Sequence, residues 1–167
     1  MTNHARAFAE RPEVYAAWQQ LNGAIKESME LRRYELATLA AARRLRSSYC
    51  MLAHGSVLAR DFFEPERVRE LALDHRSAGL EQVDVAIMEL AEKVAGDATS
   101  VTQEDIDRLR AFGLSDAEIV SVVSVAAARC FFSKALDALG VQPDASYESV
   151  EPELREALVV GRPIEAR

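Results

Sequence analysis

Residues 35–54 read ELATLAAARRLRSSYCMLAH and combine two features that organise the interpretation of the whole chain. The first half belongs to a segment, residues 31–45, that is apolar on nearly every face of a helix, which is typical of a helix buried at the centre of a protein. The second half ends with a thiol and an imidazole four residues apart, at Cys50 and His54. We therefore expect a buried central helix followed by a second helix, about 49–59, that carries the chemistry.

Helical patterns also dominate the rest of the chain. Apolar residues recur at helical spacing from Pro12 onward and again over residues 83–94. Ser115 and Glu118 have the spacing of a capping box, which marks a helix start, and the long apolar helix that follows ends at Gly140. No segment shows the alternation of a strand. The sequence predicts an all-α fold.

The length of 167 residues predicts one domain, 1–167, that is large enough to bury its own core. We expect the core to span about residues 12–140, with residues 1–10 as a loose arm. Residues 141–167 contain three prolines and six acidic residues, with a short helical candidate after Pro152. They are predicted to form an extended C-terminal tail, laid against a partner subunit of a homo-oligomer.

Charge and composition exclude several functions. The net charge is -7 and the isoelectric point is about 5.1, which disfavours nucleic acid and anionic membranes as partners. The N-terminus lacks the apolar region of a signal peptide, and no apolar run was expected to span a bilayer. Cys50 and Cys130 are far apart and flanked by helical patterns, so they are interpreted as reduced thiols of a cytoplasmic protein. Three basic residues form a solvated helix end: Arg43, Arg44 and Arg46.

The pair Cys50 and His54 is the first candidate for catalysis. Two residues four apart on a helix share a face, so the imidazole could take the proton of the thiol and stabilise the thiolate. If Ser47 or Ser48 caps this helix, Cys50 lies in its first turn, where the helix dipole also favours the thiolate. The competing interpretation is structural, because free cysteine is often a small buried hydrophobe.

Glu35 is the third candidate. An isolated carboxylate in a buried apolar helix is costly, so Glu35 should be paired or hydrogen-bonded. Next to His54 it would orient the imidazole, although a simple ion pair with Arg32 or Arg33 was an alternative. Tyr49 could add a hydroxyl to such a site. A metal site would need further ligands, and we expect neither a metal nor a cofactor. We expect three other residues outside the site: Cys130 in the core, His75 on the surface and His4 in the mobile arm.

Several segments resemble the AhpD-like alkylhydroperoxidases, which are related to the carboxymuconolactone decarboxylases. Arg33 to Ala37 resembles the Arg-x-Glu-Leu segment of the family, and Ser47 to His54 resembles its Cys-x-Tyr-Cys-x-x-x-His segment. The resemblance covers most of the chain and is closest to peroxidase-related members. It implies an all-helical, oligomeric protein.

The resemblance assigns roles to the candidate residues. Glu35, Cys50 and His54 match a proton-relay glutamate, the second cysteine of a redox pair and the following histidine, and Tyr49 matches a Tyr or His position. Ser47 stands where relatives have the first cysteine. The resemblance therefore implies a one-cysteine hydroperoxide reductase that depends on an external thiol reductant. A lyase or isomerase of a small carboxylated substrate, using Glu35 and His54 as acid and base, and a non-catalytic oligomeric module stay open.

Overall fold

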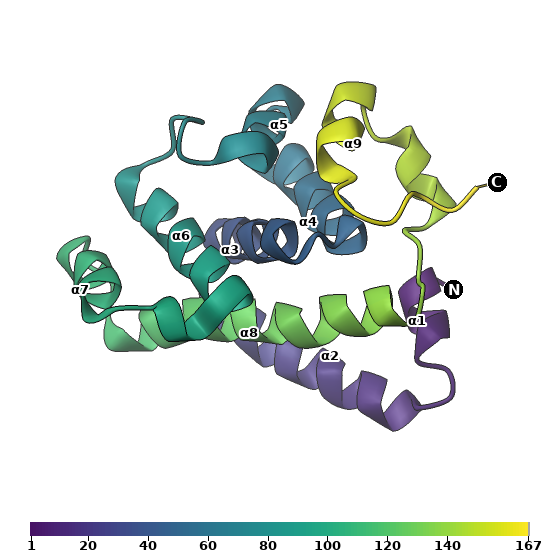
Figure 1. Cartoon of the computed structure of the whole chain (residues 1–167), viewed down its shortest axis with the longest axis horizontal. Coiled ribbons are helices and arrows are strands. Elements are labelled where there is room, and N and C mark those ends of the chain that lie inside the picture. Colours follow the sequence, from purple (N-terminus) through teal and green to yellow (C-terminus); the bar gives the residue numbers. More distant parts are fainter. Residues whose placement is uncertain (167) are drawn as a thin grey trace.

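Helix α3 (Leu31–Leu45) lies in the middle of the protein, surrounded by α4, α6 and α8 (Figure 1). The structure is a computed structural model that describes residues 1–166. Nine consecutive residues of α3, from Tyr34 to Ala42, are buried, which confirms the central helix expected from the sequence. Five of these are small (Ala37, Thr38, Ala40, Ala41 and Ala42), which allows the neighbouring helices to approach closely.

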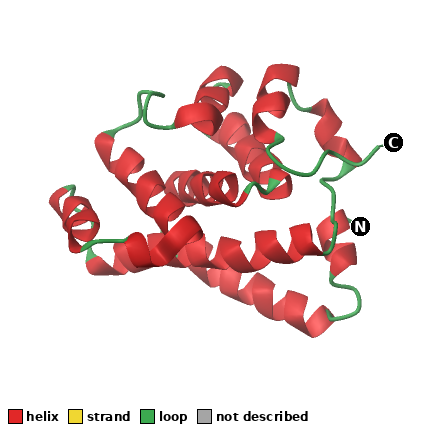
Figure 2. Ribbon diagram, viewed as in Figure 1, coloured by secondary structure: helices red, strands yellow, loops and turns green. Residues whose placement is uncertain are grey.

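The remaining helices surround α3, and no strand occurs in residues 1–166 (Figure 2), which confirms the all-α prediction. In chain order they are α1 (Asn3–Ala7), α2 (Pro12–Glu27), α4 (Ser48–Asp61), α5 (Pro65–Asp74), α6 (Gln82–Asp97), α7 (Gln103–Ala111), α8 (Asp116–Ala138) and α9 (Pro152–Leu158). Short 3-10 helices cover Ala98–Ser100 and Ala145–Ser149.

The connection from α3 to α4 is only two residues long. Arg46 adopts a left-handed conformation, with φ of 57°, and Ser47 is extended. This tight turn folds α4 back onto α3, so residues 19 positions apart in the sequence can meet across the two helices. Ser47 occupies the N-cap position of α4, as expected, but its side chain makes no capping hydrogen bond.

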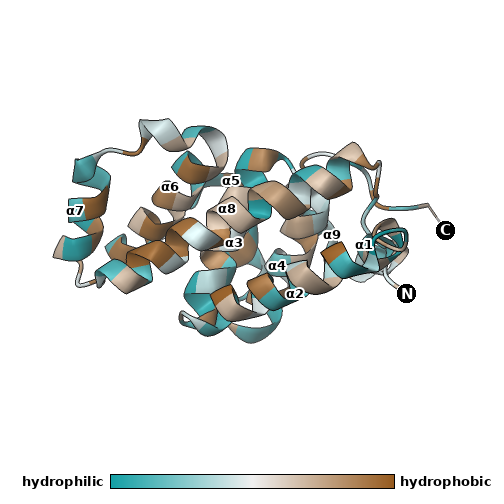
Figure 3. Cartoon of the chain, turned by 90° about the horizontal axis from the view of Figure 1, so that it is seen from below, coloured by the Kyte–Doolittle hydropathy of each residue, from teal (hydrophilic) through white to brown (hydrophobic). Residues whose placement is uncertain are grey.

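Helix α8 forms the other wall of the core. Its 23 residues start at the predicted capping box of Ser115 and Glu118, in which each side chain bonds the backbone of the other. In Figure 3 the surface helix α7 is mainly hydrophilic, whereas α8 contains long hydrophobic segments. Contrary to our expectation, α8 is long and apolar enough to span a membrane, as judged by length and composition alone. Half of that apolar segment is buried inside the protein, as in the core helix of a folded domain.

The N-terminus is an ordered part of the protein, which corrects the expectation of a loose arm. It forms α1, and Phe8 is buried and stacks on Phe132 of α8. The backbone NH of Asn3 donates to Asp144 in the C-terminal tail over 2.8 Å. The side-chain amide of Asn3 donates to the carbonyl of Gln142. Both termini therefore lie at the same end of the molecule (Figure 1).

The C-terminal tail packs on its own chain. The helical candidate after Pro152 forms α9, which lies against α5 and α4. Leu154 and Leu158 of α9 are buried, and the side chain of Leu158 covers Gly55 in α4. The tail is thus only partly extended, because its apolar residues have a hydrophobic surface to cover on α4 and α5.

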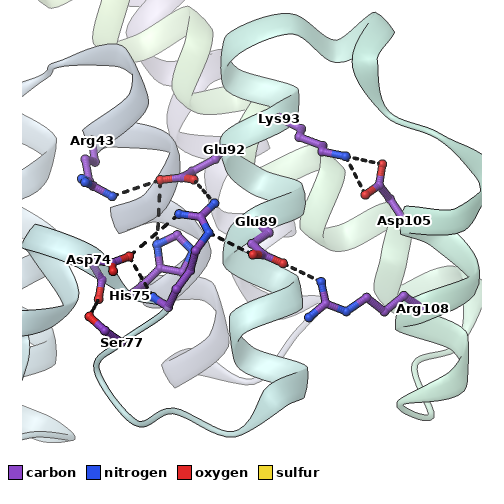
Figure 4. Close-up of polar contacts among 10 residues, drawn as sticks. Arg43, Asp74, His75, Ser77, Glu89, Glu92, Lys93, Asp105 and Arg108 are labelled. Atoms are coloured by element: carbon purple, nitrogen blue, oxygen red, sulfur yellow. Dashed lines mark hydrogen bonds and ion pairs between the residues drawn. The ribbon is translucent and has the colours of Figure 1, made fainter.

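His75 is buried, which corrects the prediction of a surface residue (Figure 4). It lies at the C-terminal end of α5, under a network of ion pairs that joins α5 to α6. Its Nδ1 is 3.8 Å from Glu92, and Glu92 also pairs with Arg43 and Arg76. Burial lowers the pKa of His75 despite the opposing effect of Glu92, so the ring is neutral at pH 7. Its position at a helix end gave no sign that α6 would cover it.

Candidate active site

A cavity of about 370 Å³ lies between α2, α4 and α8, and the tail closes part of it. It contains both members of the predicted pair, Cys50 and His54. Its walls are largely aromatic, and among its lining residues Arg129 alone is permanently charged. The other lining residues are His4, Tyr15, Trp18, Gln19, Asn22, Gly23, Tyr49, Ala53, Phe132 and Tyr147.

Glu35 and His54 form the hydrogen-bonded pair that the sequence suggested. Oε2 of Glu35 lies 2.5 Å from Nδ1 of His54, and the side chain of Glu35 is 2% exposed. Arg32 and Arg33 do not reach Glu35; they pair instead with the buried carboxylate of Asp84. A carboxylate accepts hydrogen bonds and does not donate them, so Nδ1 carries the proton.

The opposite ring nitrogen of His54 faces Arg129. Nη1 of Arg129 is 3.3 Å from Nε2 of His54, and a guanidinium can only donate. Nε2 is therefore unprotonated and accepts this hydrogen bond. Burial lowers the pKa of His54, the Glu35 carboxylate opposes this shift, and the positive charge of Arg129 adds to it. The imidazole is thus neutral at pH 7, with its lone pair on Nε2, where Arg129 donates.

Cys50 lies one helical turn before His54 and is 2% exposed, yet it lines the cavity. Its Sγ accepts a hydrogen bond of 3.2 Å from the hydroxyl of Ser133 on α8. Cys50 and His54 thus line the same cavity one helical turn apart, and a hydrogen-bond donor meets the sulfur of Cys50, an arrangement that suits a thiol nucleophile.

The two positions considered for a second thiol, Cys130 and Ser47, do not line the cavity. Cys130 is on α8 and its Sγ contacts the carbonyl of Ala95 in α6, so it lies outside the cavity and is only partly buried. Ser47 is fully buried and is not among the cavity-lining residues. Both cysteines are free. Neither Cys130 nor Ser47 offers a second thiol next to Cys50.

Tyr49 takes part in a hydrogen-bond network at the cavity wall. Its hydroxyl donates to Asp144 and contacts Nδ1 of His4 over 2.8 Å. Burial and the Asp144 carboxylate raise the pKa of Tyr49 strongly, so the phenol keeps its proton. Burial, the carboxylate of Asp144 and the sulfur of Cys50 raise the pKa of Tyr147, on the same wall, to about 12. His4, predicted to be in a mobile arm, is instead part of this wall.

The structure offers no evident cation site. Within residues 1–166, no group of three or more His, Cys, Asp and Glu side chains could hold a metal ion.

A second hollow of about 570 Å³ lies beside the C-terminal half of α6, but most of its basic residues are already paired. Arg43 and Arg76 bond Glu92, and Lys93 bonds Asp105 (Figure 4). The cavity around Cys50 is therefore the candidate site.

Residues 12–93, which include α3, α4 and the Glu35, Cys50 and His54 side chains, match the model of the carboxymuconolactone decarboxylase family. Residues 12–93 of the chain belong to this family. No curated protein matches this family member at the level of sequence.

Solved structures share the fold of this carboxymuconolactone decarboxylase family protein. The AhpD-core, peroxidase-related protein from Ralstonia eutropha JMP134 has a TM-score of 0.81 and 20% identity, over 88% of this chain and 79% of the other. A peroxidase-related protein from Silicibacter sp. TM1040 has a TM-score of 0.82 and 19% identity, over 89% and 79%. The debrominase Bmp8 in complex with 2,3,4-tribromopyrrole has a TM-score of 0.80 and 14% identity, over 94% and 83%. These likenesses establish the AhpD-like fold.

The sequence did not predict three residues around this site: Asn22, Arg129 and Ser133. Arg129 and Ser133 contact His54 and Cys50, and Asn22 accepts a hydrogen bond from Arg129. The one available signal was Arg129, the only charged residue of α8 between Glu118 and Lys134.

Proposed function

We propose that this protein is an oxidoreductase that reduces a small organic hydroperoxide with Cys50 as its single reactive cysteine. The observation that carries this proposal is the arrangement of Glu35, His54 and Cys50. The hydrogen bond of 2.5 Å between Glu35 and His54 fixes the imidazole, and His54 opens onto the same cavity as the thiol one turn away. This arrangement supplies a base, an orienting carboxylate and a nucleophile.

The reaction begins with proton transfer from the thiol of Cys50 to Nε2 of His54. The thiolate then attacks the terminal oxygen of the hydroperoxide and the O–O bond breaks. His54 returns the proton to the departing alkoxide, which leaves as an alcohol, and Cys50 becomes a sulfenic acid. Glu35 stabilises the imidazolium that exists between these two proton transfers.

Regeneration of Cys50 requires two molecules of an external thiol. The first attacks the sulfenic sulfur, releases water and forms a mixed disulfide with Cys50. The second attacks the sulfur of the bound thiol, releases a symmetrical disulfide and restores the Cys50 thiol. This route follows from the positions of Cys130, which contacts Ala95 outside the cavity, and Ser47, which has no thiol.

The Glu35–His54 pair also supports a second candidate function. A neutral imidazole oriented by a carboxylate can act as a general base without any thiol, which would suit a lyase or isomerase acting on a small carboxylated substrate. The fold is also compatible with other chemistry, because the similar Bmp8 protein is a debrominase. The cysteine discriminates between the two candidates, since acid–base chemistry does not need it.

The test is consumption of cumene hydroperoxide in the presence of excess dithiothreitol. We expect the wild type and Cys130→Ser to consume peroxide at similar rates, and Cys50→Ser to show the uncatalysed rate. Dimedone, which traps sulfenic acids, should label Cys50 after a pulse of peroxide without thiol. An unchanged rate in Cys50→Ser, or equal background rates in all three proteins, would rule out the proposed function.

A further inference from the structure

Arg129 is a buried cation without a carboxylate partner. It is 3% exposed, and within residues 1–166 no Asp or Glu side chain forms an ion pair with it. Its hydrogen-bond partners are both neutral: the amide oxygen of Asn22 and the imidazole of His54. Its Nε has no partner at all among these residues. Buried arginines are rare unless they are paired, because removing a charge from water is costly.

The surroundings of Arg129 hold its guanidinium at the wall of the cavity. Its Cζ lies 4.8 Å from the centre of the Trp18 ring and 5.5 Å from that of Phe132, so aromatic faces flank the charge. Asn22 is itself fixed by the hydroxyl of Tyr34. The guanidinium is thus oriented before any ligand arrives, which reduces the entropy lost on binding.

The charge balance of the cavity favours an anion. Of its lining residues, Arg129 alone is permanently charged, and burial lowers the pKa of both lining histidines, His4 and His54. The two carboxylates that bond lining residues are already used, since Glu35 bonds His54 and Asp144 bonds Tyr49. A cavity of about 370 Å³ with aromatic walls and one fixed cation suits a small, planar organic anion.

We propose that Arg129 binds the carboxylate of a small aromatic acid and so positions the substrate over Cys50. This inference deepens the proposed function, because it names the substrate class of the same site. A carboxylate matches the planar guanidinium in a bidentate pair, which neutral groups cannot form. The bound acid would carry the group to be reduced on the part of the molecule that faces the sulfur.

The same contact has a consequence for His54. Arg129 donates to the Nε2 lone pair that His54 needs for the proton of Cys50. A bound carboxylate competes for the Nη1 donor of Arg129 and so releases that lone pair. Arg129 therefore acts as a positioning residue for His54 as well as the anchor of the substrate.

Trp18 provides a direct test, since it is the only tryptophan of the chain and lies against Arg129. Its fluorescence would be followed during titration with benzoate and with benzamide, a neutral molecule of the same shape. We expect saturable binding of benzoate that is at least about tenfold tighter than that of benzamide, as hydrogen bonds to charged groups are stronger than neutral ones. Equal binding of the two molecules, or no binding of either, would overturn the inference.

Variants test whether Arg129 causes the preference for benzoate. Arg129→Gln should abolish the preference for benzoate, Arg129→Lys should restore part of it, and the exposed control Arg60→Gln should leave it unchanged. If Arg129→Gln does not fold, the comparison of benzoate with benzamide on the wild type still decides. A preference for benzoate that survives Arg129→Gln refutes the site.

Alkylation of Cys50 tests whether the bound carboxylate lies near the sulfur. In a Cys130→Ser background, the rate ratio of iodoacetate to iodoacetamide should fall about tenfold or more on Arg129→Gln. An unchanged ratio would overturn the placement of the substrate over Cys50. Arg129-dependent binding of benzoate without peroxide reduction would exclude the proposed function and leave the carboxylate site standing, so the two failures are distinguishable.

Discussion

Replacement of Glu35 by glutamine tests the relay at its most buried point. The change keeps the size of the side chain and removes its charge. If the new amide presents its oxygen to Nδ1 of His54, the tautomer is kept but the imidazolium loses its counter-charge. If it presents its nitrogen, the ring proton moves to Nε2, where it faces the N–H of Arg129 and cannot accept the proton of Cys50.

The size of the effect follows from the charge pair. With the charge centres roughly 4 Å apart and an effective dielectric constant of about 20, the attraction between carboxylate and imidazolium is about 4 kcal/mol. Each ~1.4 kcal/mol of lost transition-state stabilisation is tenfold in rate, so Glu35→Gln should reduce turnover by about 10³-fold. That value lies within the range of about 10²–10⁴-fold typical of general acid–base catalysis.

The assay is steady-state peroxide consumption with saturating dithiothreitol, together with urea unfolding to establish that the variant is folded. Glu104→Gln is the matched control, because the same substitution on the exposed surface of α7 should leave the rate unchanged. We expect kcat to fall while dimedone still labels Cys50 after longer exposure. If folded Glu35→Gln works within about threefold of the wild type, Glu35 has no role in the relay.

Three further outcomes are expected. Gly55→Ala should destabilise the protein by about 1–3 kcal/mol, because the new methyl would lie 2.7 Å from Leu158. Gly23→Ala, with open space around it, should instead stabilise α2 by about 0.5–1 kcal/mol. Urea unfolding of both variants measures these changes, and equal effects would contradict the packing of α9 on α4. Burial lowers the pKa of all three histidines (His4, His54 and His75), so below the ordinary value of 6.5 the unfolded chain binds protons that the folded protein does not. The free energy of unfolding should therefore be at its full value above pH 6.5 and should fall as the pH drops from 6.5 toward 5; a flat profile in that window would refute the burial of these rings. His75→Leu should weaken this pH dependence, because it removes a ring whose pKa is lowered in the folded protein. The replacement breaks no hydrogen bond, since neither ring nitrogen of His75 has a partner in residues 1–166. A steeper pH profile in the variant would contradict this prediction.

Local patterns predicted the helices and the Glu35–His54 pair, since both depend on residues within one helix or two adjacent ones. The apolar segment 31–45 could only be a buried helix, and a carboxylate inside it needed a partner nearby. The short connection at Arg46 then makes His54 the partner. This hydrogen-bonded pair was predictable because its two residues lie 19 positions apart and share a helical hairpin.

The remaining wall of the site depends on contacts between distant parts of the chain. Arg129 meets His54 across 75 residues, and Ser133 meets Cys50 across 83. His4 reaches Tyr49 from α1, and the neighbouring Asn3 is held by Asp144 in the tail. The periodicity of a single helix contains no information on such pairings. The buried state of His75 was missed for the same reason, since α6 covers it.

The buried guanidinium of Arg129 lowers the stability of the folded protein but serves the proposed binding of substrate. A buried charge that no carboxylate neutralises destabilises the folded protein, and an apolar side chain of similar length would pack against Trp18 and Phe132 without that cost. Selection for heat resistance alone would therefore favour replacement of Arg129 and remove the anchor for the substrate. Arg129 therefore lowers the stability of the folded protein, and the proposed binding of substrate requires it.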